Sequence, residues 1–333
     1  MTKKTVSLLL KLIITIAILF FLFSKVSFSA SSFWNTIKEI KTGYYFLSLL
    51  GVIVVLGIKS FRWRVLVGNE GYDYKPYKAF GAYMASDSIG IITPGRIGEI
   101  ARLYYVRQET PMPFLHAFKT VVSDRIFDFT MLGWFGLSGL TYYFKTFGEL
   151  SGYKYVLLVF IAFILAYISG LLLLNRVIRL NWFDRWQVPK FIYECFQSVV
   201  GRKAILMWAL TILAYSAYFF FSWLIMVSLQ LKLRIYDIAF IMSIMSLSTV
   251  IPISIAGFGT REATLVLLFS NYSLASETAV SFSLLHFTAF FLWGGLIGLV
   301  YWLIMPISIK QVKDDSLGII ELFKVKPKKL KDL

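Results

Sequence analysis

The chain alternates between long apolar blocks and short polar connections. A helix needs about 20 apolar residues to cross a hydrocarbon layer roughly 30 Å thick. Six blocks reach that length and predict full membrane spans, near residues 5–24, 43–61, 119–145, 153–175, 204–229 and 277–305. A signal peptide is the alternative for the first block, but its apolar stretch is long and no small-x-small cleavage site follows it. We therefore expect it to be retained as a span.

Two further apolar stretches are interrupted near their middle. Residues 80–106 contain Pro94-Gly95, and residues 238–269 contain Pro252, Gly257 and Gly259, with charged residues just after each break. Proline removes a backbone donor and glycine loosens a helix. In lipid, broken backbone persists only where protein covers it or where it lines a cavity. These stretches predict two re-entrant helical hairpins, and kinked full spans are the alternative.

The basic residues predict the orientation of the chain. With the N-terminus in the cytoplasm, 24 of the 34 Lys and Arg residues fall on the cytoplasmic side, 8 outside and 2 within spans. This bias agrees with the positive-inside rule. The first hairpin then enters from the cytoplasm and the second from outside, so that their tips meet near the midplane. Transporters built from inverted repeats have this arrangement, and the shared pattern of glycines, a turn with Arg and Glu, and an apolar helix favours an inverted repeat here.

Composition leads to the same fold class. The chain is 58% hydrophobic and only 16% charged, against about 25% charged in soluble domains, and its mean hydropathy is +0.72. This excludes a soluble enzyme, a disordered chain and a disulfide-built secreted domain. We predict an all-α integral membrane protein with one polytopic domain over residues 1–310 and a basic cytoplasmic tail over 311–333. The aromatic residues are expected mostly at the lipid-facing surface and the interfacial belts.

The net charge and the residue types limit which partners, cofactors and metals the chain is expected to bind. A net charge of +16 would suggest nucleic acid in a soluble protein, but here cytoplasmic loops beside anionic lipid explain it, and no nucleic-acid partner is expected. The chain has one cysteine, Cys195, and two distant histidines, His116 and His286. It lacks a P-loop, a GxSxG elbow and a zinc motif. We therefore expect no cofactor and no metal site.

Charged residues gather at three places within the apolar segments, although a charge at the centre of a span costs roughly 2.5–3.5 kcal/mol on insertion scales. The three clusters are Arg96, Glu99 and Arg102 after the first break, Asp124, Arg125 and Asp128 early in the third span, and Arg261 with Glu262 after the second break. Asp87 is a further isolated charge in the first interrupted stretch.

These clusters predict a site for an anion. Helix N-termini at Gly95–Gly98 and Gly257–Thr260 would offer N–H groups and positive potential to a phosphate, and arginine adds a planar fork. The predicted phosphate ligands are Arg96, Arg125, Arg261, Gly95, Gly98, Gly257 and Gly259, and the predicted charge partners are Glu99, Arg102, Asp124, Asp128 and Glu262. The alternative is internal pairing, Arg96 with Asp124 or Arg125 with Glu99, that serves packing alone.

The stretches TPGRIGEIARLYYV, SDRIFDF and ISIAGFGTREA together resemble the lysylphosphatidylglycerol synthase transmembrane-domain family, over nearly the whole chain. Asp124 stands where the second motif of that family has a glutamate. The resemblance implies the flippase-like membrane half of the bifunctional bacterial synthase/flippase, with two opposed re-entrant elements. The chain ends about 28 residues after its last predicted span, so the soluble lysyltransferase domain is expected to be absent.

We therefore expect a flippase for an anionic phospholipid or a polyprenyl-phosphate lipid, in a bacterial or archaeal cytoplasmic membrane, with both termini cytoplasmic. Its partners would be membrane lipids, and a homo-oligomer stays open. One alternative is an intramembrane lipid-modifying transferase with Glu99 or Asp124 as general base, including phosphatidylglycerol lysyltransferase by family name. Another is a membrane subunit that anchors a soluble partner through its basic loops.

Overall fold

The computed structural model describes residues 30–146, 187–200, 202–250 and 259–307, with isolated positions at 154, 157, 158, 161, 162, 165 and 169. Within these residues all regular structure is helical and no strand occurs, which confirms the all-α class. The predicted span at 5–24, most of the span at 153–175, the tip at 251–258 and the tail at 311–333 lie outside the described residues.

Three described helices are long and apolar enough to cross a membrane: Thr42–Asn69, Arg202–Ser228 and Ser276–Ile304. They coincide with three of the predicted spans. The first comprises α3 (Thr42–Ser48) and α4 (Leu50–Asn69), and the second is α10. The third comprises α13 (Ser276–His286), a π-helical segment η4 (Phe287–Leu292) and α14 (Trp293–Ile304).

Helix α7 (Phe114–Thr146) contains the third predicted span, 119–145, and extends it at its N-terminal end. Its 33 residues are about 50 Å long at 1.5 Å per residue, which exceeds the thickness of a bilayer core. Asp124 and Asp128 lie on its first half and are buried against neighbouring helices. This half of α7 is therefore charged but covered by protein.

The first interrupted stretch folds as α5 (Pro76–Ile92), a 3₁₀ segment η1 (Pro94–Ala101) and α6 (Arg102–Glu109). Thr93 is extended, with φ −102° and ψ 139°, because the residue before a proline disfavours the helical region. The chain then turns back, and η1 packs against α5. A Cβ on Gly98 would lie 2.5 Å from the carbonyl oxygen of Ile89, so glycine permits this close approach.

The second interrupted stretch folds as α11 (Ile235–Val250) and α12 (Thr260–Ser270), which pack against each other. The break itself, with Pro252 and Gly257, lies outside the described residues. Gly259 precedes α12 with φ +85°, a conformation that glycine adopts without strain.

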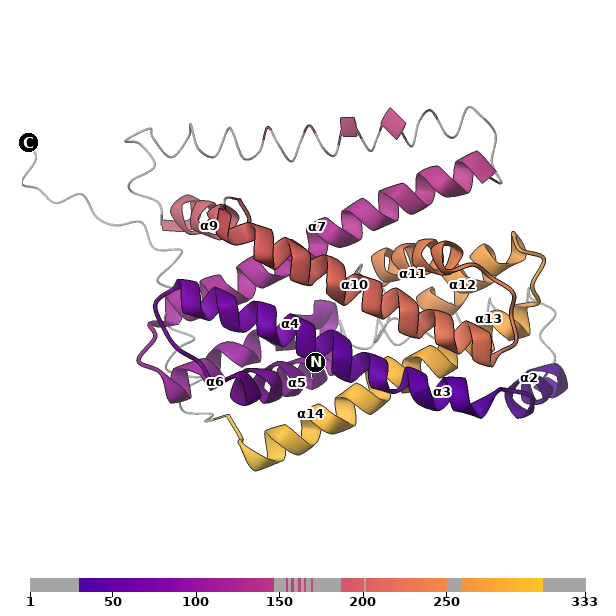
Figure 1. The fold of residues 1–333 in the computed structure, drawn as a ribbon, viewed down its shortest axis with the longest axis horizontal. Coiled ribbons are helices and arrows are strands. Elements are labelled where there is room, and N and C mark those ends of the chain that lie inside the picture. The colour runs from indigo at the N-terminus through magenta and orange to yellow at the C-terminus, as the bar shows by residue number, and fades with distance from the viewer. Residues whose placement is uncertain are drawn as a thin grey trace, which may run out of the picture.

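The long helices connect the two interrupted stretches. Figure 1 shows α5 and α6 toward one end of the α4 and α10 helices, and α11 and α12 toward the other end. The helix Ser276–Ile304 serves both ends, since α14 packs on α5 and α13 packs on α12. The π-helical segment η4 lies between them, at the middle of that helix.

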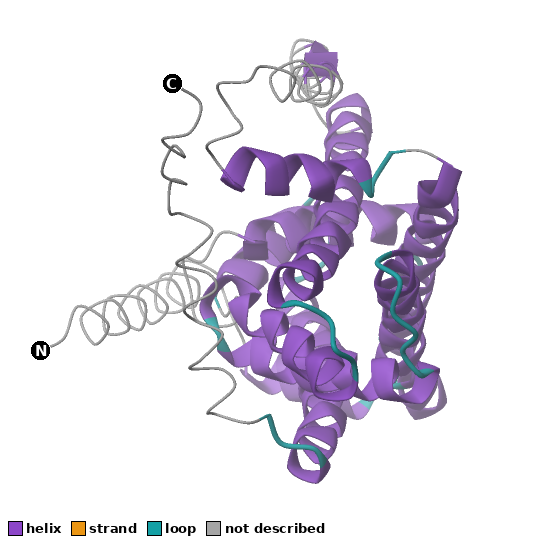
Figure 2. Cartoon of the chain, turned by 90° about the vertical axis from the view of Figure 1, so that its left-hand side faces the viewer, coloured by secondary structure: helices purple, strands orange, loops and turns teal. Residues whose placement is uncertain are grey.

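Figure 1 shows two short helices, α2 and α9, at the margins of this bundle, and the turned view in Figure 2 shows helices and connecting loops and no strand among the described residues. Helix α2 (Ala30–Lys38) packs on α13, and α9 (Gln187–Gln197) packs on α7. Phe191 of α9 stacks on Phe118 of α7 at 5.4 Å. Cys195 faces inward from α9, and burial raises the pKa of its thiol to about 12, so that it stays a protonated packing group.

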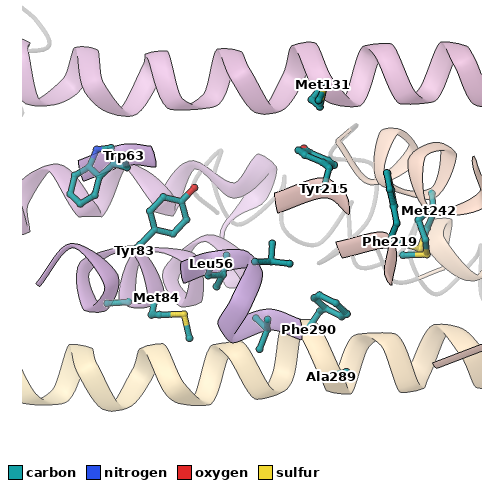
Figure 3. Close-up of a cluster of buried hydrophobic side chains, with 14 of the residues drawn as sticks. Leu56, Trp63, Tyr83, Met84, Met131, Tyr215, Phe219, Met242, Ala289 and Phe290 are labelled. Carbon is teal, nitrogen blue, oxygen red and sulfur yellow. The ribbon is translucent and has the colours of Figure 1, made fainter. Parts of the chain in front are cut away.

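The core lies between α7 and the long C-terminal helix. Figure 3 shows Trp63, Tyr83, Tyr215 and Phe290 among the buried side chains there. The rings of Trp63 and Tyr83 meet edge to face with centroids 6.4 Å apart. The charged residues of the candidate site, described below, pack against this layer of aromatic side chains.

Candidate functional site

Asp124 of α7 is the centre of a fully buried charge network. Its Oδ1 accepts a hydrogen bond from Arg62 Nε at 2.7 Å. Its Oδ2 lies 2.8 Å from Arg102 Nη2 and accepts a hydrogen bond from the Tyr83 hydroxyl at 3.0 Å. The side chains of Arg62, Arg102 and Asp124 are all 0% exposed. One carboxylate thus joins three other helices to α7.

The network continues one helical turn along α7. Asp128 lies 3.1 Å from Arg62 Nη2 and 3.1 Å from Lys59 Nζ. Arg62 also donates to Thr211 of α10 at 2.8 Å, and the Lys59 ammonium lies 5.0 Å from the centroid of the Tyr215 ring. Helices α4, α7 and α10 are therefore tied together by charges inside an apolar bundle.

A second group of charges surrounds Glu99 in η1 and reaches the surface of the protein. Arg96 Nε lies 2.8 Å from Glu99 Oε1, Arg125 contacts the other oxygen of Glu99, and Arg96 also contacts Asp87. Glu99 and Asp87 are buried, whereas the Arg96 side chain is 44% exposed and that of Arg125 is 23% exposed. These two guanidinium groups are therefore the accessible part of the cluster.

The backbone at Arg96 is strained. Its φ is +56°, a left-handed conformation that costs a residue with a Cβ roughly 1–2 kcal/mol. Such strain persists where surrounding contacts fix the residue, and it gathers at functional sites. Here the contacts are the ion pairs with Asp87 and Glu99.

A third group lies at the start of α12. Glu262 Oε1 lies 3.0 Å from Arg261 Nη2 and accepts from the Ser283 hydroxyl at 2.6 Å. Its Oε2 accepts from the Gly259 N–H at 2.7 Å. Arg261 is 1% exposed and also donates to Ser283 Oγ at 2.8 Å. The carboxylate of Glu262 thus occupies the helix N-terminus that the sequence assigned to an anion.

Phe291 in the π-helical segment brings the first and third motifs together. Its ring centroid lies 5.8 Å from Arg96 Cζ and 5.8 Å from Arg261 Cζ. Arg261 also lies 5.0 Å from the ring of Phe287, which stacks on Phe291 at 5.7 Å. Cation–π contacts of this kind attract a guanidinium to a ring, and π-helical segments are frequent at functional sites. Arg96 therefore lies between Arg125, with which it shares Glu99, and Arg261, with which it shares Phe291.

A family model described as the lysylphosphatidylglycerol synthase TM region matches residues 8–298. The chain belongs to this family. It is also 23% identical, over 334 aligned positions, to UPF0104 membrane protein MJ1595 of Methanocaldococcus jannaschii, with 94% of this chain and 98% of that relative covered. No solved structure matches the chain. The resemblance drawn from the three motifs is thereby confirmed, and the chain is a membrane protein.

The lysylphosphatidylglycerol synthase TM-region motifs come together, but their pairing differs from part of the sequence-based hypothesis. Arg125 pairs with Glu99, which is one of the two ion pairs named in the packing alternative. Arg96 does not pair with Asp124; it pairs with Asp87 and Glu99 instead. The reason is that Arg62 and Arg102 already hold both oxygens of Asp124.

Two glycines of these motifs, Gly98 and Gly259, donate their N–H groups to neighbouring side chains. The Gly98 N–H donates to Thr93 Oγ1 at 2.8 Å, and the Gly259 N–H donates to Glu262. Gly95 lies in the first turn of η1, and Gly257 lies outside the described residues. Among the described residues, the arginine side chains are thus better placed for an anion than the two glycine N–H groups.

Sequence reasoning missed two cations of the charge network on α7, Lys59 and Arg62, which it counted among the cytoplasmic charges. Arg62 and Arg102 are fully buried, so neither supports the orientation through the positive-inside rule. The signal was present, because Lys59 and Arg62 are three residues apart in an apolar helix and so share a face. Among the described residues no group of three His, Cys, Asp or Glu could hold a metal ion.

Proposed function

We propose that this membrane protein is a flippase that moves a lipid with an anionic phosphate, an anionic phospholipid or a polyprenyl-phosphate, between the leaflets. The observation that carries the proposal is the position of Arg96 between Arg125, with which it shares Glu99, and Arg261, with which it shares Phe291. Guanidinium groups bind phosphate bidentately. Held within an apolar bundle, they can attract a lipid head group away from water.

The carboxylates around the arginines keep the empty site neutral. An uncompensated charge inside an apolar region is strongly unfavourable, and Asp87 and Glu99 together supply two negative charges to Arg96 and Arg125. A phosphate that reaches the exposed parts of Arg96 and Arg125 would compete with Glu99 and Asp87 for them. Exchange between these partners would let the head group enter and leave.

The packing of the two interrupted stretches supports a pair of opposed re-entrant hairpins. Helix α5 runs antiparallel to α14, with Gly81 beside Tyr301 and the Ser88 hydroxyl 3.0 Å from the Gly295 carbonyl oxygen. Segment η1 therefore reaches the middle of the helix Ser276–Ile304 from one end. Helix α12 packs on α13 and starts near that middle from the other end. Broken helices that meet in this way form the substrate sites of many transporters.

The arrangement favours binding over transferase chemistry. A lipid-modifying transferase would need Glu99 or Asp124 as a general base. Each of these carboxylates contacts two guanidinium groups, Glu99 those of Arg96 and Arg125, Asp124 those of Arg62 and Arg102. In the flippase proposal these pairs are the resting state of the site, with the chain in a cytoplasmic membrane and both termini in the cytoplasm.

Arg96→Ala and Arg261→Ala should each slow lipid exchange at least about tenfold, because a hydrogen bond to a charged group contributes roughly 1.5–3 kcal/mol. The assay measures dithionite-accessible fluorescent phosphatidylglycerol in proteoliposomes. Arg64→Ala is the matched control, since Arg64 lies on α4 and pairs with the exposed Asp73 outside the cluster. Exchange by the wild type no faster than in empty liposomes, or equal exchange by all four proteins, would contradict the proposal.

Phe291→Leu should slow the same exchange roughly five- to thirtyfold. The leucine keeps apolar volume but loses two cation–π contacts, each about 0.5–1 kcal/mol. Phe220→Leu on α10 is the control, because Phe220 is an exposed phenylalanine that packs on Phe221 and Trp223. If both variants exchange lipid at the wild-type rate, Phe291 does not hold the two arginines in a working geometry.

A further inference from the structure

Among the described residues, the connected ion pairs of α4, α5, η1, α6 and α7 contain one more cation than carboxylates. The cations of this cluster are Lys59, Arg62, Arg96, Arg102 and Arg125, and its carboxylates are Asp87, Glu99, Asp124 and Asp128. The separate pair Arg261–Glu262 is balanced. A surplus positive charge in an apolar bundle is unfavourable unless a counter-charge enters or a proton leaves.

Lys59 is the member of this cluster that can lose its charge. Arginine keeps its proton in proteins, whereas a lysine that is removed from water gives its proton up readily. The position of Lys59 suits this role, because its side chain is 17% exposed while Arg62 and Arg102 are 0% exposed. A proton can therefore reach Lys59 from the accessible edge of the cluster.

Charged and aromatic side chains surround the Lys59 amine, and their balance decides whether it binds a proton. From α7, Asp128 Oδ2 lies 3.1 Å from the Lys59 Nζ and attracts an ammonium there, while Arg125, three residues before Asp128 on the same helix, repels one. From the helix of Lys59 itself, Arg62 shares Asp128 and also repels an ammonium, and from α10 the Tyr215 ring attracts one. In the described part of α5, Tyr83 directs its hydroxyl to Asp124. An anion added beside Arg125 would offset the two opposing cations and favour the charged lysine.

Resting on the proposed function, we infer that Lys59 couples lipid movement to a proton. When a phosphodiester head group brings its single negative charge to Arg96 and Arg125, the neutral Lys59 amine takes up one proton from water, and five cations then face five anions. When the head group leaves, Lys59 releases the proton to water on that side. The protein thus carries one proton with each head group, in the same direction.

A pH gradient across proteoliposomes tests this coupling. Vesicles of neutral phosphatidylcholine carry a trace of fluorescent phosphatidylglycerol and an entrapped pH dye. The wild type should gather the probe in the leaflet that faces the alkaline compartment, toward about tenfold per pH unit at equilibrium, and the dye should report proton movement with it. Lys59→Arg, which fixes the charge, should still exchange the probe but should give no gradient-driven accumulation.

Two controls separate this inference from the proposed function. Lys78→Arg, whose lysine pairs with Glu109 outside the cluster, should accumulate the probe as the wild type does. Lys59→Met, permanently neutral, should also lose the accumulation. If the wild type exchanges the probe but neither accumulates it nor moves protons, or if Lys59→Arg accumulates it normally, the coupling is overturned while the flippase stands. A wild type that does not exchange the probe at all overturns both. If neither Lys59 variant folds, proton movement by the wild type decides the question.

Discussion

Asp124→Ala is expected to destabilise the folded protein by about 3–5 kcal/mol, the range found when one partner of a buried ion pair is removed. Asp124 is fully buried and holds Arg62 and Arg102 through its two oxygens, with the Tyr83 hydroxyl as a third donor. Alanine would leave two buried guanidinium groups with one carboxylate, Asp128, in reach of only one of them. Neither arginine can shed its charge to relieve the loss.

The unfolding temperature of the detergent-purified protein, measured by fluorescence-detected size-exclusion chromatography after heating, checks this expectation. Asp73→Ala is the matched control, because Asp73 pairs with Arg64 but is 88% exposed, and exposed pairs contribute at most about 1 kcal/mol. If Asp124→Ala melts at the same temperature as the control, the buried network does not stabilise the bundle.

Asp124→Glu separates the charge of this residue from its size. Glutamate stands at this position in the second motif of the family that the sequence resembles. It keeps the charge of Asp124 but adds a methylene to a fully covered position. Overpacking of that kind costs about 1–3 kcal/mol. We therefore expect an unfolding temperature between those of the wild type and Asp124→Ala. A glutamate variant as unstable as the alanine variant would show that shape, and not charge, limits this site.

The interruption of the first of the two broken apolar stretches could be predicted because its cause is local. Pro94 keeps the backbone of Thr93 out of the helical region and so ends α5, whatever the tertiary structure around it. The clusters of charge were also visible, since each stands out against apolar neighbours. The partners of these charges could not be predicted. The spacing of residues along one helix shows which of them share a face, but it does not show which other helix packs on that face. Asp124 therefore met Arg62 of α4 where the sequence suggested Arg96.

A span boundary concealed the two missed cations. The sequence ended the second span at residue 61, two residues after Lys59 and just before Arg62, but the helix continues to Asn69. Lys59 and Arg62 consequently lie inside the bundle against Asp128. A cation pair at i, i+3 within an apolar helix is the signal to extend such a span, because buried cations require a partner on the facing helix.

Polar side chains a few residues away in the sequence accept the hydrogen bonds of the glycine N–H groups. Thr93 precedes Gly98 by five residues and Glu262 follows Gly259 by three, and each accepts the N–H that the sequence assigned to a phosphate. A glutamate at the third position of a helix commonly reaches back in this way. The role of Phe291, by contrast, had no sequence signal, because phenylalanine in a span usually faces lipid.

The contact between α5 and α14 connects fold stability to the site. Gly298 of α14 faces α5, and a small residue at such a position lets helix backbones approach closely, whereas Gly294 faces Val52 of α4. A Cβ on Gly298 would collide with the backbone carbonyl of Met84 and the hydroxyl of Ser88 on α5. The Ser88 hydroxyl also reaches the Gly295 carbonyl oxygen across this contact. Helix α5 in turn supports η1 and Arg96.

Gly298→Ala is therefore expected to lower stability by about 1–3 kcal/mol, the cost of overpacking a close contact, and to slow lipid exchange because α5 and η1 must move away from Phe291. Gly295→Ala is the matched control on the same helix, since a Cβ there would meet only the end of Ile91 at 3.6 Å. It should be neutral or stabilise the helix by up to about 1 kcal/mol. Unfolding temperature and exchange rate are measured on both variants. Equal unfolding temperatures of the two alanine variants would mean that α5 does not pack on α14 as closely as the contact between Gly298 and the Met84 carbonyl implies. Equal exchange rates would mean that the position of Arg96 does not depend on this packing.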